Sequence, residues 1–230
     1  MISILTPTRK RPKQLARMVR SAWETALNPP EIVVYIDDND NSYDLSHPVN
    51  DGIGALDVKI VDGPRILLTD TWNKCYEVST GDILLQGNDD IIFRTPRWDV
   101  MVEEEFEKCC DKILMVHGDD LGCQHESFGA HCFVHRKWVE AVGFFIAPWF
   151  SSDFGDTVLN FAANQLDRRR YLPMAIEHQH FIFGKAVVDE TTKDRLTNHV
   201  RDNPEQIYEQ KLPERMQMVE KLGAVIRNAK

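Results

Sequence analysis

The fold is decided by Gly81-Asp82-Ile83-Leu84-Leu85-Gln86-Gly87-Asn88-Asp89-Asp90-Ile91-Ile92-Phe93, residues 81–93 of the chain. Ile83–Leu85 is a short apolar run between a Gly-Asp turn and Gly87, as is typical of a strand buried on both faces of a sheet. The strand ends on Asn88-Asp89-Asp90. Two adjacent carboxylates there repel each other and are poorly solvated, so a nearby positive charge would stabilise them. A hard cation, Mn²⁺ or Mg²⁺, suits carboxylate oxygens and keeps positions open for phosphate. The alternative is an ordinary acidic turn.

The sequence before this strand alternates strands and helices. Apolar runs and breakers predict strands at Ile2–Leu5, Glu31–Ile36 and Val58–Val61, a helix starting near Pro12, a surface loop at Asn41–Gly54 and a helix at Thr69–Ser79 capped by Thr69. A strand, a helix and a strand in this order form a parallel unit, whose ligands gather at the carboxyl ends of the strands. The segments Thr6–Arg9, Asp37–Asp40 and Asn88–Asp90 all fall at that edge.

The rest of the chain continues the α/β pattern. It predicts helices at Pro96–Cys110, Lys137–Val142 and Asp156–Leu166, and strands at Ile113–His117, His131–Val134 and Tyr171–Glu177. We therefore expect an α/β fold with a mostly parallel sheet flanked by helices. Residues 203–230, opened by Asn203-Pro204 and interrupted by Pro213, are expected to form a C-terminal helical extension.

Composition narrows the class of protein. The 230 residues carry 27 basic and 36 acidic side chains, a net charge of −9, which weighs against a large nucleic-acid backbone interface but leaves room for a local basic groove. Five cysteines without regular spacing favour reduced thiols and a cytoplasmic location. We expect neither a signal peptide nor a membrane span.

Four short motifs resemble, in order and spacing, the nucleotide-sugar half of family-two glycosyltransferases with the GT-A fold. They are Ser3-Ile4-Leu5-Thr6-Pro7-Thr8-Arg9, Val33-Val34-Tyr35-Ile36-Asp37-Asp38, Trp72-Asn73-Lys74, and Gly81-Asp82-Ile83 leading to Asn88-Asp89-Asp90. Phe128–Asp189 resembles the acceptor half more loosely. The resemblance implies a GT-A-like (Rossmann-like) domain over residues 1–202, with a nucleotide-sugar half at 1–95 and an acceptor half at 96–202. It implies a metal-dependent transfer of sugar from a nucleotide sugar, with a UDP-sugar favoured, to a hydroxyl group, with inversion favoured over retention.

The resemblance also implies roles for individual residues. The donor-binding residues would be Thr6, Pro7, Thr8, Arg9, Asp38, Asn73, Asn88 and Asp89. Asp90 would ligate the metal, at the place of the family's Asp-X-Asp motif. Asn88 departs from that motif at its first position, although an amide can still form a hydrogen bond there. The alternatives are a plain strand-to-helix turn for Thr6–Arg9 and a solvated acidic loop for Asp37–Asp40.

A general base and a histidine would complete the site. Inverting transfer needs a base for the acceptor hydroxyl, and the resemblance leaves Asp156 and Asp153 as candidates, with Asp156 preferred. Capping of a helix is the alternative role for Asp156. His178 and His180 alternate, so in a strand they would point to the same side. The resemblance implies that a histidine late in the domain completes the metal site, which leaves His178 and His180 as the candidate metal ligands. The alternative for them is a hydrogen-bonded surface pair.

Two other functions remain open at this point. A nucleotidyltransferase on a similar sheet would want a glycine in the phosphate loop, and Thr6–Lys10 has none. A non-catalytic carbohydrate-binding or assembly module would not need Asp89, Asp90, Asp156 and His178 together. The sequence does not identify the acceptor, which could be a saccharide, a small molecule, a protein or a modified DNA base.

Overall fold

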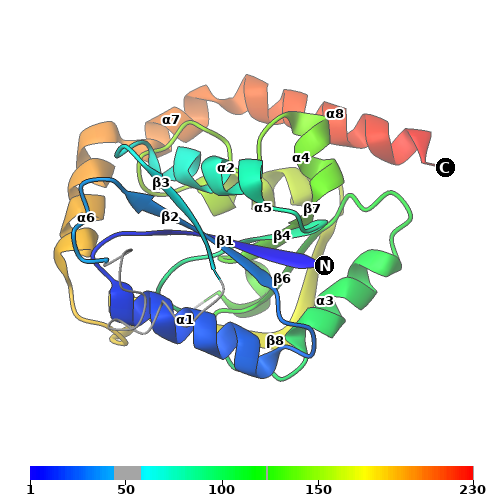
Figure 1. Cartoon of the computed structure of the whole chain (residues 1–230). Coiled ribbons are helices and arrows are strands. Elements are labelled where there is room, and N and C mark those ends of the chain that lie inside the picture. The colour runs from blue at the N-terminus through cyan, green and yellow to red at the C-terminus, as the bar shows by residue number, and fades with distance from the viewer. Residues whose placement is uncertain (44–57, 123, 230) are drawn as a thin grey trace.

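The computed structural model describes residues 1–43, 58–122 and 124–229. Most of the loop expected at Asn41–Gly54 lies outside these residues. The strands form one sheet in the order β3-β2-β1-β4-β7-β6-β8-β5 (Figure 1). Their bounds are β1 Ile2–Thr8, β2 Glu31–Asp37, β3 Lys59–Gly63, β4 Ile83–Gln86, β5 Ile91–Phe93, β6 Met115–Asp119, β7 Cys132–His135 and β8 Arg169–His178.

The sheet is mixed. The strand pairs β3-β2, β2-β1, β1-β4 and β6-β8 are parallel, as expected for the first half of the chain. The pairs β4-β7, β6-β7 and β5-β8 are antiparallel. Strand β7 lies between β4 and β6 and so joins the strands of the two halves of the chain into one sheet. The carboxyl ends of β1, β2 and β4 therefore lie at the same edge as residues from the second half. All four residues of β4 are buried, in agreement with the continuous apolar run.

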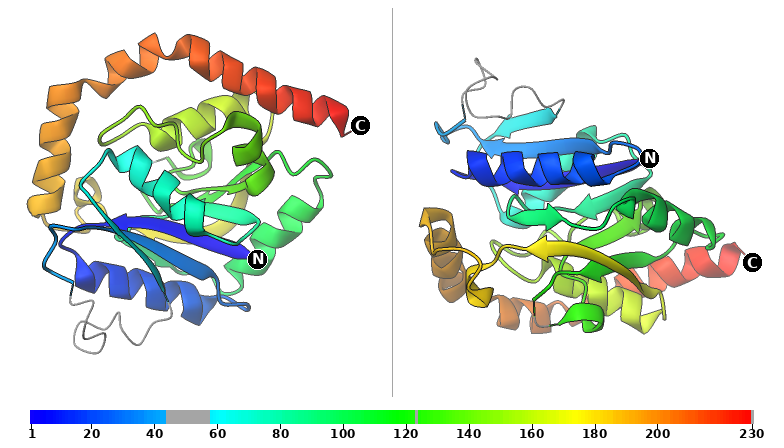
Figure 2. Two further views of the ribbon diagram at one scale, coloured as in Figure 1. Left: turned by 45° about the horizontal axis from the view of Figure 1, so that its top comes forward. Right: turned by 90° about the horizontal axis from the view of Figure 1, so that it is seen from below.

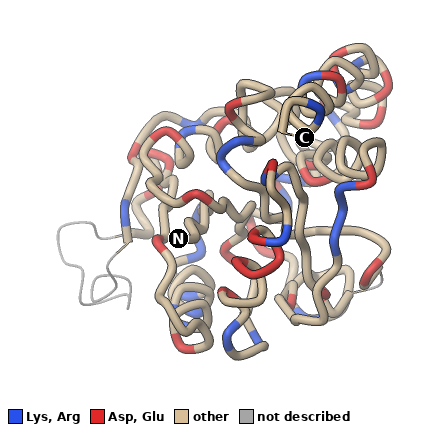
Figure 3. Tube along the Cα trace, turned by 90° about the vertical axis from the view of Figure 1, so that its right-hand side faces the viewer, with Lys and Arg blue, Asp and Glu red and all other residues tan. Residues whose placement is uncertain are grey.

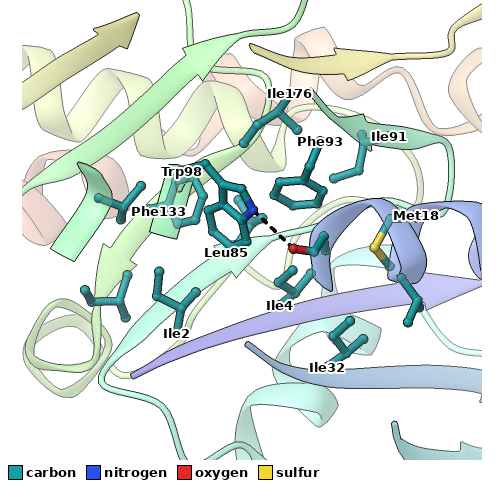
Figure 4. Packing of buried hydrophobic residues seen from close by; sticks show 14 of the residues in the cluster. Ile2, Ile4, Met18, Ile32, Leu85, Ile91, Phe93, Trp98, Phe133 and Ile176 are labelled. Atoms are coloured by element: carbon teal, nitrogen blue, oxygen red, sulfur yellow. Dashed lines mark hydrogen bonds between the residues drawn. The ribbon is translucent and has the colours of Figure 1, made fainter. Parts of the chain in front are cut away.

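Helices cover both faces of the sheet. Their bounds are α1 Pro12–Thr25, α2 Leu68–Val78, α3 Trp98–Glu107, α4 Arg136–Val142, α5 Gly155–Gln165, α6 Glu190–Asp202, α7 Pro204–Gln210 and α8 Leu212–Asn228. One buried cluster joins α1 and α3 to the sheet, and the other joins α2, α4, α5 and α8 to it. In Figure 4, Trp98 packs beside Phe93 and Phe133. Its indole N–H donates to the backbone oxygen of Ala22 at 3.3 Å, so the buried polar atom is satisfied.

Two predicted helix starts are wrong. Thr69 is not a cap, because α2 begins at Leu68 and the Thr69 hydroxyl instead donates to the backbone oxygen of Phe150 at 2.9 Å. Asp156 is not a cap either, because the N-cap of α5 is Phe154. The predicted interruption near Pro213 is confirmed, because α7 ends at Gln210 and α8 begins at Leu212, with Pro213 in the first turn of α8, where a missing N–H costs nothing.

The C-terminal helices run in an arc around the sheet (Figure 2). Helix α6 was not predicted, and only Thr192 is buried along it, so it lacks the apolar periodicity on which the prediction relied. Helix α8 contributes Met218 and Leu222 to the second core cluster. None of the described helices is long and apolar enough to cross a bilayer. In the view of Figure 3, acidic and basic residues are interspersed along the trace.

Candidate functional site

A cavity of about 470 Å³ opens at the carboxyl ends of β1, β2 and β4. It is the edge at which the sequence places ligands. The structure brings most of the predicted site residues to this cavity. Those that line it are Pro7, Thr8, Arg9, Asn88, Asp89, Asp90, Asp153, Asp156, His178 and His180. Residues from both halves of the chain therefore share one site.

Three predicted donor residues do not line the cavity. Thr6 is fully buried under the acidic motif, where a Cβ at Gly87 would lie 2.5 Å from its hydroxyl oxygen. Asp38 is exposed on the turn after β2, whereas Asp37, the last residue of that strand, is buried and lines the cavity. Asn73 is occupied elsewhere, because its amide nitrogen donates to two backbone oxygens and its oxygen accepts from the N–H groups of residues 145 and 146.

Arg11 supplies a positive charge beside the acidic pair, a role that the sequence analysis missed. Its Nη1 lies 3.1 Å from Asp89 Oδ1 and 3.4 Å from Asp90 Oδ2. Thr8 donates to the other oxygen of Asp89 at 2.7 Å. Burial, followed by the charge of Asp90, raises the pKa of Asp89. Burial opposes ionisation of Asp90 as well, but the His178 imidazole and the Arg11 guanidinium outweigh it and lower the pKa of Asp90. Asp90 is therefore the more readily ionised carboxyl group of the pair.

His178 reaches Asp90 through the antiparallel pairing of β5 with β8. Ile91 stands opposite His178 in this register, so the residue before Ile91 and the end of β8 are neighbours. The Nε2 atom of His178 lies 3.3 Å from Asp90 Oδ1. That oxygen is buried and has no hydrogen-bond partner among the described residues. A carboxylate oxygen and an imidazole nitrogen facing each other at the cavity wall are a suitable pair of donors for Mn²⁺.

His180 also lines the cavity and has a structural role in the turn after β8. Strand β8 ends at His178, and the His180 ring accepts a hydrogen bond from the N–H of Ile182 at 3.4 Å, which caps the following turn. The rings of His178 and His180 are 4.9 Å apart. Within the described ranges, no group of three or more His, Cys, Asp or Glu side chains is arranged to hold a metal ion. A cation bound by Asp90 and His178 would need further ligands from a substrate.

Asp156 and Asp153 differ sharply in their surroundings. Asp153 is paired with Arg195 Nη1 at 2.5 Å and with His199 Nδ1 at 2.7 Å. Asp156 lies in the first turn of α5, where Oδ1 accepts the N–H of Thr157 at 2.7 Å. Burial, followed by the charge of Asp153, raises the pKa of Asp156 to about 6. Burial therefore makes Asp156 easier to protonate than an ordinary aspartate, whereas Asp153 is engaged by two basic groups.

The backbone before Asp156 is held in an unusual conformation. Phe154 has φ +74°, in the left-handed region that non-glycine residues rarely adopt. Its ring packs between Phe150, with centroids 5.8 Å apart, and Tyr208, with centroids 5.4 Å apart. These aromatic contacts fix the entry into α5 and so the direction of Asp156. Strain of this kind is common where a side chain must be aimed at a ligand.

Helix α6 closes one side of the cavity and is held mainly by polar contacts. At its start, Asp189 accepts two hydrogen bonds from Arg11, at 2.7 and 2.8 Å, and Thr191 donates to the backbone oxygen of Arg9 at 2.7 Å. Further along, Arg195 and His199 bind Asp153. The helix therefore bridges the two halves of the site. Its signals in the sequence are the cap at Asp189 and the basic residues of its last turn, which do not depend on apolar spacing.

Comparison with solved structures identifies the fold. Structure comparison aligns the chain with TarS of S. aureus at a TM-score of 0.57 and 12% identity, covering 76% of this chain and 36% of TarS. It also aligns with glucosyl-3-phosphoglycerate synthase of Mycobacterium tuberculosis in complex with Mn²⁺, UDP-glucose and phosphoglyceric acid, at 0.54 and 13%, covering 78% and 72% of the two chains. The mannosyltransferase PcManGT of Pyrobaculum calidifontis, in complex with GDP-mannose and Mn²⁺, aligns at 0.55 and 12%, covering 99% and 74%. The fold is the GT-A fold.

The GT-A fold confirms the fold class predicted from the sequence motifs. No family model and no curated protein matches the sequence. The match spans 36% of the TarS chain and 59% of the TarS 1–349 chain that was solved with UDP.

Proposed function

We propose that the chain is a metal-dependent glycosyltransferase that moves a sugar from a nucleotide sugar, with UDP favoured as the nucleotide, to a hydroxyl acceptor with inversion. The observation that carries this proposal is that a candidate cation site and a candidate general base line the same cavity. A carboxylate-imidazole pair, Asp90 and His178, stands at one wall, and the high-pKa carboxylate of Asp156 stands at another. A cation and a base are the two groups that sugar transfer from a diphosphate requires.

The donor would lie along the first strands. Arg9 pairs with Asp37 at 2.5 Å, and both line the cavity together with Tyr35 and Arg65. Buried hydrogen-bonding groups next to an aromatic ring suit a nucleoside. Solved neighbours of the same fold hold UDP, UDP-N-acetylglucosamine or UDP-glucose, and one holds GDP-mannose, which supports a nucleotide sugar and makes UDP the first choice.

Asp90 and His178 fit a divalent cation. Asp90 Oδ1 is buried without a partner and faces an imidazole nitrogen, so it has an open acceptor position at the cavity wall. Mn²⁺ or Mg²⁺ held there would stabilise the negative charge of the departing nucleoside diphosphate. Three of the neighbouring structures are complexes with Mn²⁺. Arg11 lies beside the same carboxylates and would add a second positive charge near the diphosphate.

Asp156 would act as the general base. Its carboxylate takes the proton of the acceptor hydroxyl while that oxygen forms a bond to the anomeric carbon. The bond from the anomeric carbon to the diphosphate breaks, and its electron pair leaves with the phosphate oxygen. A pKa of about 6 keeps Asp156 mostly ionised at neutral pH and still able to accept a proton as the transition state forms. Asp153 would hold α6 in place through Arg195 and His199.

A two-step experiment tests this proposal. Calorimetric titration with UDP, with and without Mn²⁺, should show tighter binding with the metal. A screen of nucleotide sugars for slow metal-dependent hydrolysis should then identify the donor without knowledge of the acceptor. Binding without any hydrolysis or transfer would support a carbohydrate-binding module instead. Release of pyrophosphate from a nucleoside triphosphate and a sugar phosphate would support a nucleotidyltransferase.

The cellular setting remains a prediction. The four described cysteines at positions 75, 109, 110 and 132 are all free thiols, which supports a reducing compartment such as the cytoplasm.

The acceptor would bind on the side of the cavity that is lined by Phe128, Phe154 and Phe181, whose faces can stack on a sugar or a base.

A further inference from the structure

His131 is a buried imidazole whose polar atoms have no partner. It precedes β7, is 3% exposed, and neither ring nitrogen forms a hydrogen bond with a described residue. The backbone of Gln86 approaches the ring, but no contact there has the geometry of a hydrogen bond. An uncompensated buried polar group destabilises the fold, so it calls for an explanation by function or by an absent partner.

The surroundings of His131 suggest that explanation. Its ring stands edge-on to the ring of His178, with centroids 4.9 Å apart and planes at 76°. His178 in turn faces Asp90 at 3.3 Å. Asp90 Oδ1 and both nitrogens of His131 are three buried polar atoms without partners, and His178 touches both residues. They gather at the place that we assign to the cation.

The ring itself is not needed to fill the core. Phe is also a planar ring that can stand edge-on to His178, and it buries no polar atom, although its six-membered ring is somewhat larger. A histidine at this position therefore costs stability that an apolar ring would not. Such local conflicts between a residue and its surroundings are expected at functional sites.

We propose that His131 is a positioning residue of the cation site. The polar edge of its ring keeps the surroundings of His178 and Asp90 polar, which lowers the cost of burying a divalent cation between them. The same ring holds the His178 side chain in the orientation that faces Asp90. The inference rests on the proposed function, because it assigns the cation to Asp90 and His178. Groups that support metal ligands in this way typically change metal affinity by 10- to 100-fold when they are removed.

His131→Phe tests the role of the ring nitrogens, and His117→Phe is the matched control. His117 is also fully buried with an unpartnered Nε2, but its ring lies against Tyr171, with centroids 5.6 Å apart. The measurements are the affinity for Mn²⁺ in the presence of UDP, by calorimetry or by Mn²⁺ electron paramagnetic resonance, and the unfolding temperature in EDTA.

We expect His131→Phe to weaken Mn²⁺ binding by at least about tenfold while the unfolding temperature in EDTA stays the same or rises. His131→Gln, which restores a polar atom, should recover part of the affinity and serves if the Phe variant does not fold. His117→Phe should bind Mn²⁺ like the wild type. Wild-type affinity in His131→Phe, or an equal loss in His117→Phe, would overturn the inference alone. A wild-type chain that binds no Mn²⁺ with UDP would overturn the proposed cation site together with it.

Discussion

Asp156→Asn separates the chemical role of Asp156 from its structural role. The substitution keeps the shape of the side chain and an oxygen that can accept the Thr157 N–H, but it removes the charge. The carboxylate is held in surroundings that disfavour ionisation, because burial raises its pKa from 3.8 to about 6. The variant should therefore lose the general base, and it should be more stable because the buried charge is removed.

The stability effect can be estimated from the pKa. A rise of about two units, at about 1.4 kcal/mol per unit, corresponds to roughly 3 kcal/mol for a fully shielded group. The side chain borders the cavity and is only partly covered, so we expect about 1–2 kcal/mol. For a chain of this size that is a rise of about 2–8 °C in unfolding temperature.

The sign of the pH dependence follows from the raised pKa. The protonated carboxyl contributes stability that is complete below about pH 4 and is lost as the pH rises through about 6. The gain in Asp156→Asn should therefore appear at neutral pH and vanish in acid. In the wild type, kcat/KM should fall as the pH drops through about 6, because the base becomes protonated.

The assay compares sugar transfer, UDP affinity and thermal unfolding at two pH values. Asp156→Asn should bind UDP with Mn²⁺ like the wild type, lose roughly 10²- to 10⁴-fold in transfer, and unfold at a higher temperature at neutral pH. Normal transfer by Asp156→Asn would refute the assignment of the base. If Asp156→Asn transfers sugar normally and also shows the predicted rise in unfolding temperature, the raised pKa of Asp156 would be supported, but the base would be another residue or the mechanism would be retaining.

Three further predictions concern the other walls of the cavity. Asp90→Asn should lower turnover by orders of magnitude with Mn²⁺ while circular dichroism shows an intact fold; near-normal turnover would remove Asp90 from the cation site. Asp37→Ala should weaken UDP binding about tenfold because it frees Arg9, whereas the exposed neighbour Asp38→Ala should not, as titration would show. Asp153→Asn should increase hydrogen exchange in α6, since Arg195 loses its charged partner, yet reduce transfer less than Asp156→Asn; unchanged exchange would contradict the bridging role.

The mixed character of the sheet shows where local patterns stop being informative. The apolar run of Ile83–Leu85 and its flanking glycines predict a buried strand and place Asn88–Asp90 at its end, and both are found. The antiparallel insertion of β7 between β4 and β6 depends on pairing between residues 15 or more positions apart, and nothing in either strand alone specifies it.

The choice between neighbouring residues was also made by the tertiary structure. Asp37 and Asp38 are alike in sequence, but the last residue of β2 turns into the cavity beside Arg9 and the next one faces solvent. The sequence analysis placed the donor-binding loop at Thr6–Arg9, but it is Arg11 that contacts Asp89 and Asp90. Arg11 immediately precedes α1, and the start of this helix lies beside the acidic pair. Short-range patterns do not determine such orientations, since these depend on contacts with distant strands.

The sequence by itself determined the class of fold, the edge that carries the site and the acidic pair at the centre of that edge, because these follow from apolar runs, turn residues and the geometry of parallel strands. Only the tertiary structure decided that His178 faces Asp90, that Asp153 is engaged by α6 while Asp156 lines the cavity in the first turn of α5, and that His131 lies beside His178. The physical reason is that α6 is held by ion pairs and capping bonds, which leave no periodic apolar signal. His178 meets Asp90 through the β5-β8 pairing, whereas His131 reaches His178 from the start of β7, and neither contact is visible in a local pattern.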